Sequence, residues 1–176
     1  MSDRTIRIVR APYDETARFL TAFIVHHQLS DGSTCIALRL PNGIFAERRS
    51  VVERRLWANV YPRRARRDRE HVYAVTWSLR SVGAFPEFNG ALAIEPGESG
   101  DTSNLHLSGN YELLPYARTA DVALFRRVAH ASARELLRTI ADYVENACAH
   151  DFAARAGYSK PMQFSMLSSN SSALAT

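Results

Sequence analysis

Histidine, serine and acidic residues, which could carry acid–base or metal chemistry, are scattered along the 176-residue chain outside any known motif. The six histidines form no HxxxH or HExxH pair, and the adjacent His26 and His27 point about 100° apart on a helix. Ser108 lies in Leu-Ser-Gly-Asn rather than in a G-x-S-x-G turn, and both glycine-rich phosphate loops are absent. The sequence therefore singles out no catalytic residue and predicts neither a metal site nor a cofactor.

Wide aromatic side chains point instead to the binding of an apolar molecule. Alternate residues of a strand face the same side, so strand parity selects the side chains that would face a covering helix. We predict a ligand-binding set composed of Trp57, Tyr73, Trp77, Phe85, Leu107 and Tyr111. The two Trp and two Tyr rings offer rigid apolar walls with N–H and O–H groups that orient a ligand, although plain core packing would use the same residues. On the same parity His106 faces away from the helix.

One charge run stands out, from Tyr61 to Glu70, which reads YPRRARRDRE. Guanidinium groups suit carboxylates and phosphates, so the Arg63–Arg69 loop is a candidate for contacting an acidic partner. A loop between two strands must be polar in any case, and a solvated loop is the simpler interpretation. The excess of 22 basic over 18 acidic residues is modest and no aromatic residue is interleaved in the run, which disfavours nucleic acid as a partner.

The cysteines and the N-terminus bear on the compartment. Cys35 and Cys148 have no CxxC or Cys/His spacing, which suits reduced thiols. The segment MSDRTIRIVRAPYDE lacks the apolar run of a signal peptide, and the longest mainly apolar stretch, Phe19–Val25, is too short to span a bilayer. We expect a cytoplasmic protein without a membrane span.

The elements that would position these residues follow from hydrophobic periodicity. Thr5–Arg10 alternates as a half-buried strand does, with Ile6 and Ile8 on one face, and a helical period begins at Tyr13 and stops at Asp31-Gly32. Stretches rich in β-branched and aromatic residues, separated by turn signals, then predict further strands. These strands lie near Ser33–Leu40, Phe45–Tyr61, His71–Arg80, Asn89–Glu95 and Thr102–Leu113.

A last helix is predicted by one apolar stripe from Val122 to Ala147, while its opposite face carries Arg126, Arg127, Arg134, Arg138 and Asp142. Short polar turns between strands require antiparallel pairing, so the strands should form a meander. Only this helix is long enough to cover the apolar face of that sheet. We therefore expect an α+β fold in which a curved antiparallel sheet wraps around the helix and leaves a concavity.

The second half of the chain resembles a known superfamily. Trp77 precedes Phe85–Leu92 (FPEFNGAL), which is followed by Leu105–Tyr111 (LHLSGNY) and the long helix. This text and the element order resemble bacterial proteins of unassigned function in the START-like helix-grip superfamily (SRPBCC). The resemblance implies a helix-grip fold, with a sheet of six or seven strands, and commonly a hydrophobic ligand. Leu114–Arg118 departs from the family pattern because its turn before the helix lacks glycine.

The resulting hypothesis is a START-like helix-grip domain at residues 1–157 followed by a flexible Ser/Ala-rich tail at residues 158–176. We expect it to bind a hydrophobic or aromatic small molecule, lipid- or polyketide-like, between the sheet and the last helix. Two alternatives stay open. One is a polyketide cyclase or dehydratase, which needs an acid/base pair inside the cavity. The other is an interaction protein that uses the arginine loop on an acidic partner. The sequence does not decide the oligomeric state.

Overall fold

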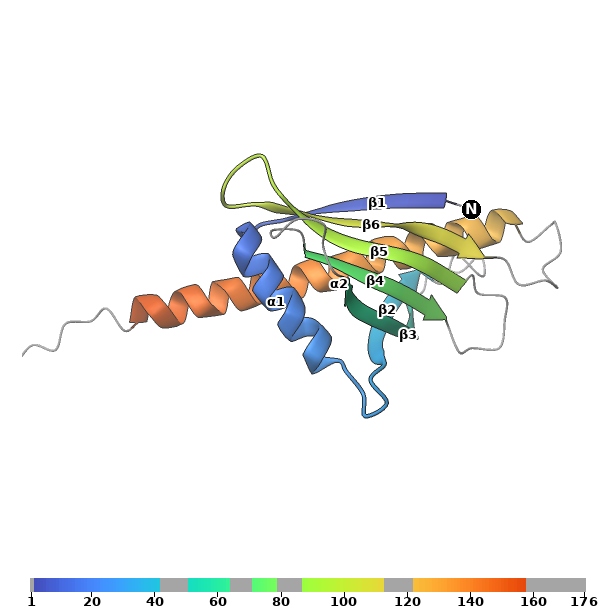
Figure 1. The fold of residues 1–176 in the computed structure, drawn as a ribbon, viewed down its shortest axis with the longest axis horizontal. Coiled ribbons are helices and arrows are strands. Elements are labelled where there is room, and N and C mark those ends of the chain that lie inside the picture. Colours follow the sequence, from blue (N-terminus) through green and yellow to red (C-terminus); the bar gives the residue numbers. More distant parts are fainter. Residues whose placement is uncertain (1, 42–50, 64–70, 79–86, 113–121, 158–176) are drawn as a thin grey trace, which may run out of the picture.

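The computed structural model describes residues 2–41, 51–63, 71–78, 87–112 and 122–157 (Figure 1). Its elements follow the predicted order of a strand, a helix, a run of strands and a long helix. They are β1 (Ser2–Val9), α1 (Tyr13–His26), β2 (Thr34–Pro41), β3 (Val51–Arg63), β4 (His71–Ser78), β5 (Glu87–Pro96), β6 (Ser103–Glu112) and α2 (Val122–Gly157). The predicted α+β class is confirmed.

The described strands form one six-stranded sheet in the order β1-β6-β5-β4-β3-β2, with every neighbouring pair antiparallel. β2 to β6 make the predicted meander. β1 pairs with β6, so the strands that come first and last in the sequence lie side by side. α1 then carries the chain across to the far edge of the sheet at β2 (Figure 1). The sheet therefore has two edges, β1 and β2, that are joined by one helix.

α2 closes the curled sheet along its concave side. Its 36 residues span about 54 Å, and Figure 1 shows it running the length of the sheet and projecting past α1. The helix backbone comes close to β1, β2 and β6 and stays farther from the central strands β3, β4 and β5. Only large side chains can fill the space under the centre of the sheet.

Two carboxylates tie α2 to the sheet edges. Oε1 of Glu135 accepts the backbone N–H of Arg39 in β2 at 3.3 Å, and Oε1 of Glu145 accepts the N–H of Arg10, just after β1, at 2.9 Å. An edge strand presents unpaired backbone groups, and these bonds satisfy one such group at each side of the helix. The helix is thereby attached to both margins of the sheet.

The core lies between the concave face and the helices. α2 buries one stripe, as its periodicity predicts, and α1 adds a second buried face from the side. The buried residues of α2 are Phe125, Val128, Ala129, Ser132, Ala133, Leu136, Leu137, Ile140, Ala141 and Val144, and those of α1 are Thr16, Ala17, Leu20 and Phe23. Each fully buried large side chain contributes about 1.5–3 kcal/mol to stability, so the stripe fixes which side of α2 faces the sheet.

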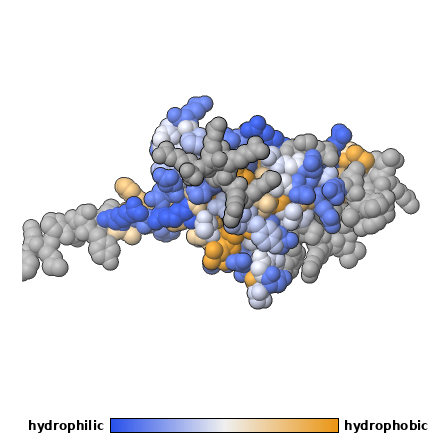
Figure 2. Space-filling view, viewed as in Figure 1, coloured by the Kyte–Doolittle hydropathy of each residue, from blue (hydrophilic) through white to orange (hydrophobic). Residues whose placement is uncertain are grey.

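The two helices are also joined by charge where α2 projects beyond the sheet. Arg18 of α1 pairs with Glu15 and lies 2.6 Å from Asp151 of α2, which in turn pairs with Arg155 at 2.8 Å. The hydrogen bond from Arg18 lowers the pKa of the Asp151 carboxyl. Figure 2 shows hydrophilic and apolar residues side by side on this projecting part, and these ion pairs lie at its exposed surface.

Several strand boundaries differ from the predictions: β1 begins at Ser2 rather than Thr5, and β5 spans Glu87–Pro96 rather than Asn89–Glu95. The strand predicted at Phe45–Tyr61 is described from Val51, and residues 45–50 lie outside the described part. β3 continues to Arg63, because the ladder with β4 includes Pro62 opposite Tyr73 and Arg63 opposite Val72. Proline lacks the N–H that a ladder uses, which is why the sequence favoured a turn there.

β1 forms as predicted, and Ile6 and Ile8 do share a face, but this face is the outer one. Ile6 is 52% and Ile8 63% exposed, whereas Val9 is fully buried. The antiparallel register with β6 decides the outcome, because it aligns Ile6 with His106 and Thr5 with the buried Leu107. Within the described residues, no helix is long and apolar enough to cross a membrane.

Candidate ligand-binding site

Three aromatic rings meet on the concave face where β4 and β6 end and β5 begins. The register aligns Trp77 with Phe88 and Phe88 with Tyr111, so the rings come from three adjacent strands. Trp77 stacks on Phe88 with ring centroids 4.0 Å apart, and Tyr111 lies 4.9 Å from Phe88 and 6.1 Å from Trp77. Each ring is at most 3% exposed. We call this cluster of Trp77, Phe88 and Tyr111 the aromatic end of the interior.

Two glycines make room for the Phe88 ring. Gly90 and Gly109 lie opposite each other on β5 and β6. A Cβ atom on either glycine would lie 2.6 Å from Cζ of Phe88 and within 2.7 Å of the backbone of the other. Real Cβ atoms do not come so close to their neighbours, so glycine is required at both positions for the ring to lie on the sheet.

α2 contributes polar groups next to this cluster. The Tyr111 hydroxyl donates a buried hydrogen bond of 3.0 Å to the carbonyl oxygen of Ala129. Ser132, three residues further along α2, is 2% exposed, and its Oγ has no hydrogen-bond partner within the described part of the chain. Leaving a buried hydroxyl unsatisfied costs about 1–3 kcal/mol, so the described residues leave the Ser132 hydroxyl open to a further hydrogen bond.

The opposite end of the interior, beside α1, is filled. Its apolar side chains leave a gap of about 10 Å³, which borders on the least volume that holds one water molecule. Its lining includes Leu20 and Phe23 of α1, Ile36 of β2, Leu92 of β5 and Ile140 of α2. No apolar ligand fits there without displacing the helix.

The predicted site residues divide between these ends. Trp77 and Tyr111 lie together at the aromatic end, whereas the Tyr73 hydroxyl lies 3.2 Å from the Thr21 hydroxyl of α1. Leu107 is buried opposite Leu92, which lines the filled end of the interior beside α1. The structure therefore brings two of the predicted residues together and places the other two toward α1.

The two remaining predictions fall at the limits of the described residues. The backbone of Trp57 lies in β3 opposite Cys35 and Ser78, and its side chain is outside the described part. Phe85 is outside it altogether. The sequence analysis missed Phe88. Strand parity could have found it, because Phe88 alternates with Leu92 and Ile94, both of which are buried.

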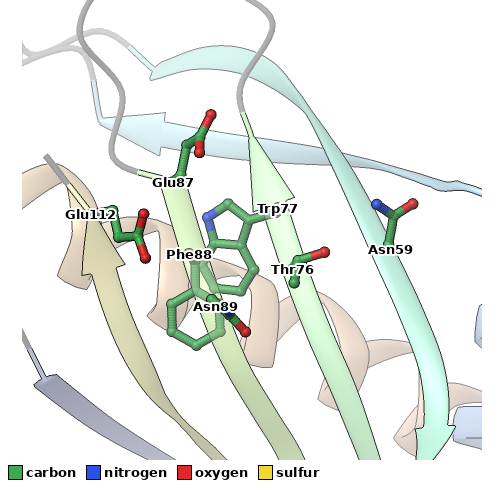
Figure 3. Close-up of a pocket in the computed structure, with 7 residues that line it drawn as sticks. All are labelled: Asn59, Thr76, Trp77, Glu87, Phe88, Asn89 and Glu112. Atoms are coloured by element: carbon green, nitrogen blue, oxygen red, sulfur yellow. The ribbon is translucent and has the colours of Figure 1, made fainter. Parts of the chain in front are cut away.

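A polar hollow of about 250 Å³ lies on the outer side of the sheet at the same end (Figure 3). It is lined by Trp77 and Phe88 together with polar side chains from four strands, namely Asn59, Thr76, Glu87, Asn89 and Glu112. Glu87 and Glu112 lie opposite each other on β5 and β6. Like charges in that position destabilise a sheet, so this rim favours a ligand with hydroxyl or amino groups over an anion.

Acid–base chemistry has little to use in the described interior. The buried polar residues are His106 and the hydroxyl residues Thr16, Thr34, Ser103 and Ser132. His106 points to the outer side, with Nδ1 3.0 Å from a guanidinium nitrogen of Arg4 and Nε2 3.0 Å from Oε2 of Glu95. A guanidinium only donates, so Nδ1 accepts and the proton resides on Nε2, facing the carboxylate. His106 thus connects three strands and does not face the interior.

Metal and thiol chemistry gain no support from the described residues. They contain no group of three or more histidine, cysteine or acidic side chains placed to hold a metal ion. Cys35 and Cys148 are free, and burial raises the pKa of the Cys148 thiol, which keeps it protonated.

A curled antiparallel sheet closed by one long C-terminal helix is a helix-grip fold, as the resemblance implied. No family model matches the sequence, and no curated protein matches it. Solved structures do match. A protein from Thermus thermophilus is 16% identical with a TM-score of 0.50, over 84% of this chain and 99% of that one. A conserved protein from Geobacillus kaustophilus is 12% identical with a TM-score of 0.51, over 85% and 96%.

A START superfamily protein from Mycobacterium smegmatis is also similar, at 13% identity and a TM-score of 0.48, over 83% of this chain and 98% of that one. At such identities the likeness concerns the fold alone. Any ligand therefore has to be argued from the side chains of this chain.

Proposed function

We propose that the aromatic end of the interior binds a small, flat apolar molecule that carries a hydroxyl group. The observation that carries this proposal is the stack of Trp77, Phe88 and Tyr111, all directed to the concave side where the backbone of α2 stands away from the central strands. A flat ligand would stack on these rings as they stack on one another, and each such ring pair contributes about 0.5–1.5 kcal/mol beyond its buried area.

Ser132 is the reason for assigning a hydroxyl group to the proposed ligand. Its buried Oγ lies within one helical turn of the carbonyl that accepts the Tyr111 hydroxyl, and it lacks a partner among the described residues. A ligand hydroxyl would satisfy it. Because the described interior offers hydroxyls but no inward carboxylate or imidazole, binding is a better proposal than cyclase-type catalysis.

The experiment compares two probes that differ by one hydroxyl, naphthalene and 2-naphthol. In the variant Trp57→Phe, Trp77 is the remaining tryptophan and its fluorescence reports on the aromatic end. We expect both probes to change this fluorescence and to raise the melting temperature, since a ligand at ten times its Kd stabilises by about 1.4 kcal/mol. No change with either probe up to its solubility limit would overturn the proposal.

The variant Ser132→Ala separates the role of the hydroxyl from that of the rings. We expect it to weaken 2-naphthol about tenfold, the equivalent of one hydrogen bond of about 1.4 kcal/mol, and to leave naphthalene unchanged. An equal effect on both probes would show that Ser132 acts only through packing.

A further inference from the structure

The outer face of α2 forms the floor of a second, larger hollow, with a volume of about 650 Å³. It lies between the two edge strands of the sheet, because its lining combines residues 5–7 of β1 and Arg39 of β2 with one side of α2. Five of its lining residues are arginines, namely Arg7, Arg39, Arg127, Arg134 and Arg138. We call this hollow the arginine groove.

The groove concentrates positive charge. Its five arginines face two carboxylates, Glu135 in the lining and Asp142 beside it, which leaves an excess of three positive charges. Arg138 is paired with Glu135 at 2.7 Å and with Asp142 at 2.6 Å. The other four arginines form no ion pair within the described part of the chain. Their guanidinium groups are available to an external anion.

This arrangement has no benefit for the fold. Arg134 and Arg138 are one turn apart on α2, and like charges at that spacing destabilise a helix by about 0.2–0.5 kcal/mol. Arg7 and Arg39 add further positive charge from the strands on either side. Arg39 and Arg138 act on Glu135, but Arg7, Arg127 and Arg134 have no acidic partner among the described residues, which favours a binding surface for negative charge.

The floor of the groove is apolar, which narrows the class of partner. Thr5 and Ala131, both half-buried, line it between the arginines, and the apolar stems of the arginine side chains add to this surface. A nucleic acid backbone offers phosphates but no apolar surface, and among the described residues no Phe, Tyr or Trp side chain lines the groove to stack on bases. A small anion needs an enclosed site, whereas this groove lies open across the helix between two strands.

We propose that the arginine groove docks an acidic amphipathic segment of a partner protein. The carboxylates of the segment would pair with the unpartnered guanidinium groups, which form two-pronged bonds with carboxylates. Its apolar side chains would cover Ala131 and the apolar stems of the arginine side chains. This surface lies on the side of α2 opposite to the aromatic end, so it is independent of the ligand proposed above.

The test uses the full chain and a fluorescein-labelled peptide with glutamate and leucine at helical spacing. A peptide in which glutamine replaces every glutamate is its control. Fluorescence polarisation should show that the glutamate peptide binds at least tenfold more tightly, with an affinity that falls as salt rises. Duplex DNA and phosphatidylglycerol vesicles are measured beside it. Tighter binding of either one, or no binding of the glutamate peptide, would overturn the proposal.

A matched pair of variants locates the surface. Arg126 and Arg127 are adjacent on α2 and both are exposed, but only Arg127 lines the groove. We expect Arg127→Ser combined with Arg134→Ser to weaken the peptide about tenfold or more, and Arg126→Ser to have less than a twofold effect. If the double variant and Arg126→Ser lose the same binding affinity for each arginine removed, the peptide responds to net charge alone. This result also contradicts the proposal.

Discussion

The two faces of α2 carry different kinds of information. On the inner face the residues are apolar and closely packed, and Leu136 is 2% exposed. On the outer face, two residues away, Arg134 is exposed and lines the arginine groove. The inner face explains why the helix lies in the sheet. Glu135 attaches this face to β2, but the exposed Arg127 and Arg134 take no part in that packing, so they need another explanation.

The two faces also differ in how they treat polar groups. The inner face has one unsatisfied hydroxyl, Ser132, among apolar neighbours, whereas the outer face has several charges without partners in the described residues. A buried unsatisfied group costs stability, while an exposed charge is solvated and costs little. Substitutions on the two sides of α2 should therefore differ in stability by a large factor.

The largest effect is expected from Leu136→Ala compared with Arg134→Ala. Removing the Leu136 side chain leaves a cavity in the core and should lower the free energy of unfolding by about 2–5 kcal/mol. Arg134→Ala should change it by no more than about 0.5 kcal/mol. Urea unfolding followed by circular dichroism measures both, and similar losses would show that the outer face is also part of the core.

An intermediate effect is expected at the glycine pair under Phe88. Gly109→Ala brings a Cβ within 2.6 Å of the Phe88 ring and of Gly90, so it should destabilise by about 1–3 kcal/mol. Gly100→Ala is the matched control, because its Cβ would meet no atom within 4 Å. Thermal unfolding distinguishes them. A Gly109→Ala protein as stable as the control would mean that the ring does not rest on the glycines.

The smallest effect concerns pH and the outer face. The hydrogen bond from Arg138 lowers the pKa of Glu135 below its ordinary 4.5, so the folded state favours the ionised carboxylate. Its contribution is present above pH 4.5 and is lost as pH falls through the lower pKa of the folded protein. Glu135→Gln should reduce stability by less than about 1 kcal/mol at pH 7, and the difference should shrink at acid pH. Urea unfolding of the unmodified protein and of Glu135→Gln, from pH 7 down to acid pH, measures this difference in stability. A difference that grows as pH falls would contradict the prediction.

Much of the fold was predictable from local patterns. The apolar stripe from Val122 onward predicted the inner face of α2, and the short turns predicted the antiparallel meander from β2 to β6. Both predictions depend only on residues that are close to one another in the sequence, so a local pattern is sufficient for each prediction. The aromatic end was partly predictable for the same reason, since Trp77 and Tyr111 were placed by strand parity.

Other features depended on pairing between distant segments. The sequence analysis chose Phe85 from FPEF and missed Phe88, which the ladder aligns with both Trp77 and Tyr111. It associated positive charge with the Arg63–Arg69 run, most of which lies outside the described residues. The arginine groove combines residues 7, 39 and 127–138, which no local pattern connects.

The sequence alone determined the order of the elements and the side of α2 that is buried, because hydrophobic periodicity acts within one element. Only the tertiary structure decided that Ile6 and Ile8 face outward, that Phe88 lies on two glycines, and that arginines from two strand edges meet on the outer face of α2. Each of these depends on how strands align and where the helix crosses them. Such alignments are set by the packing of the whole core, and no single segment encodes them.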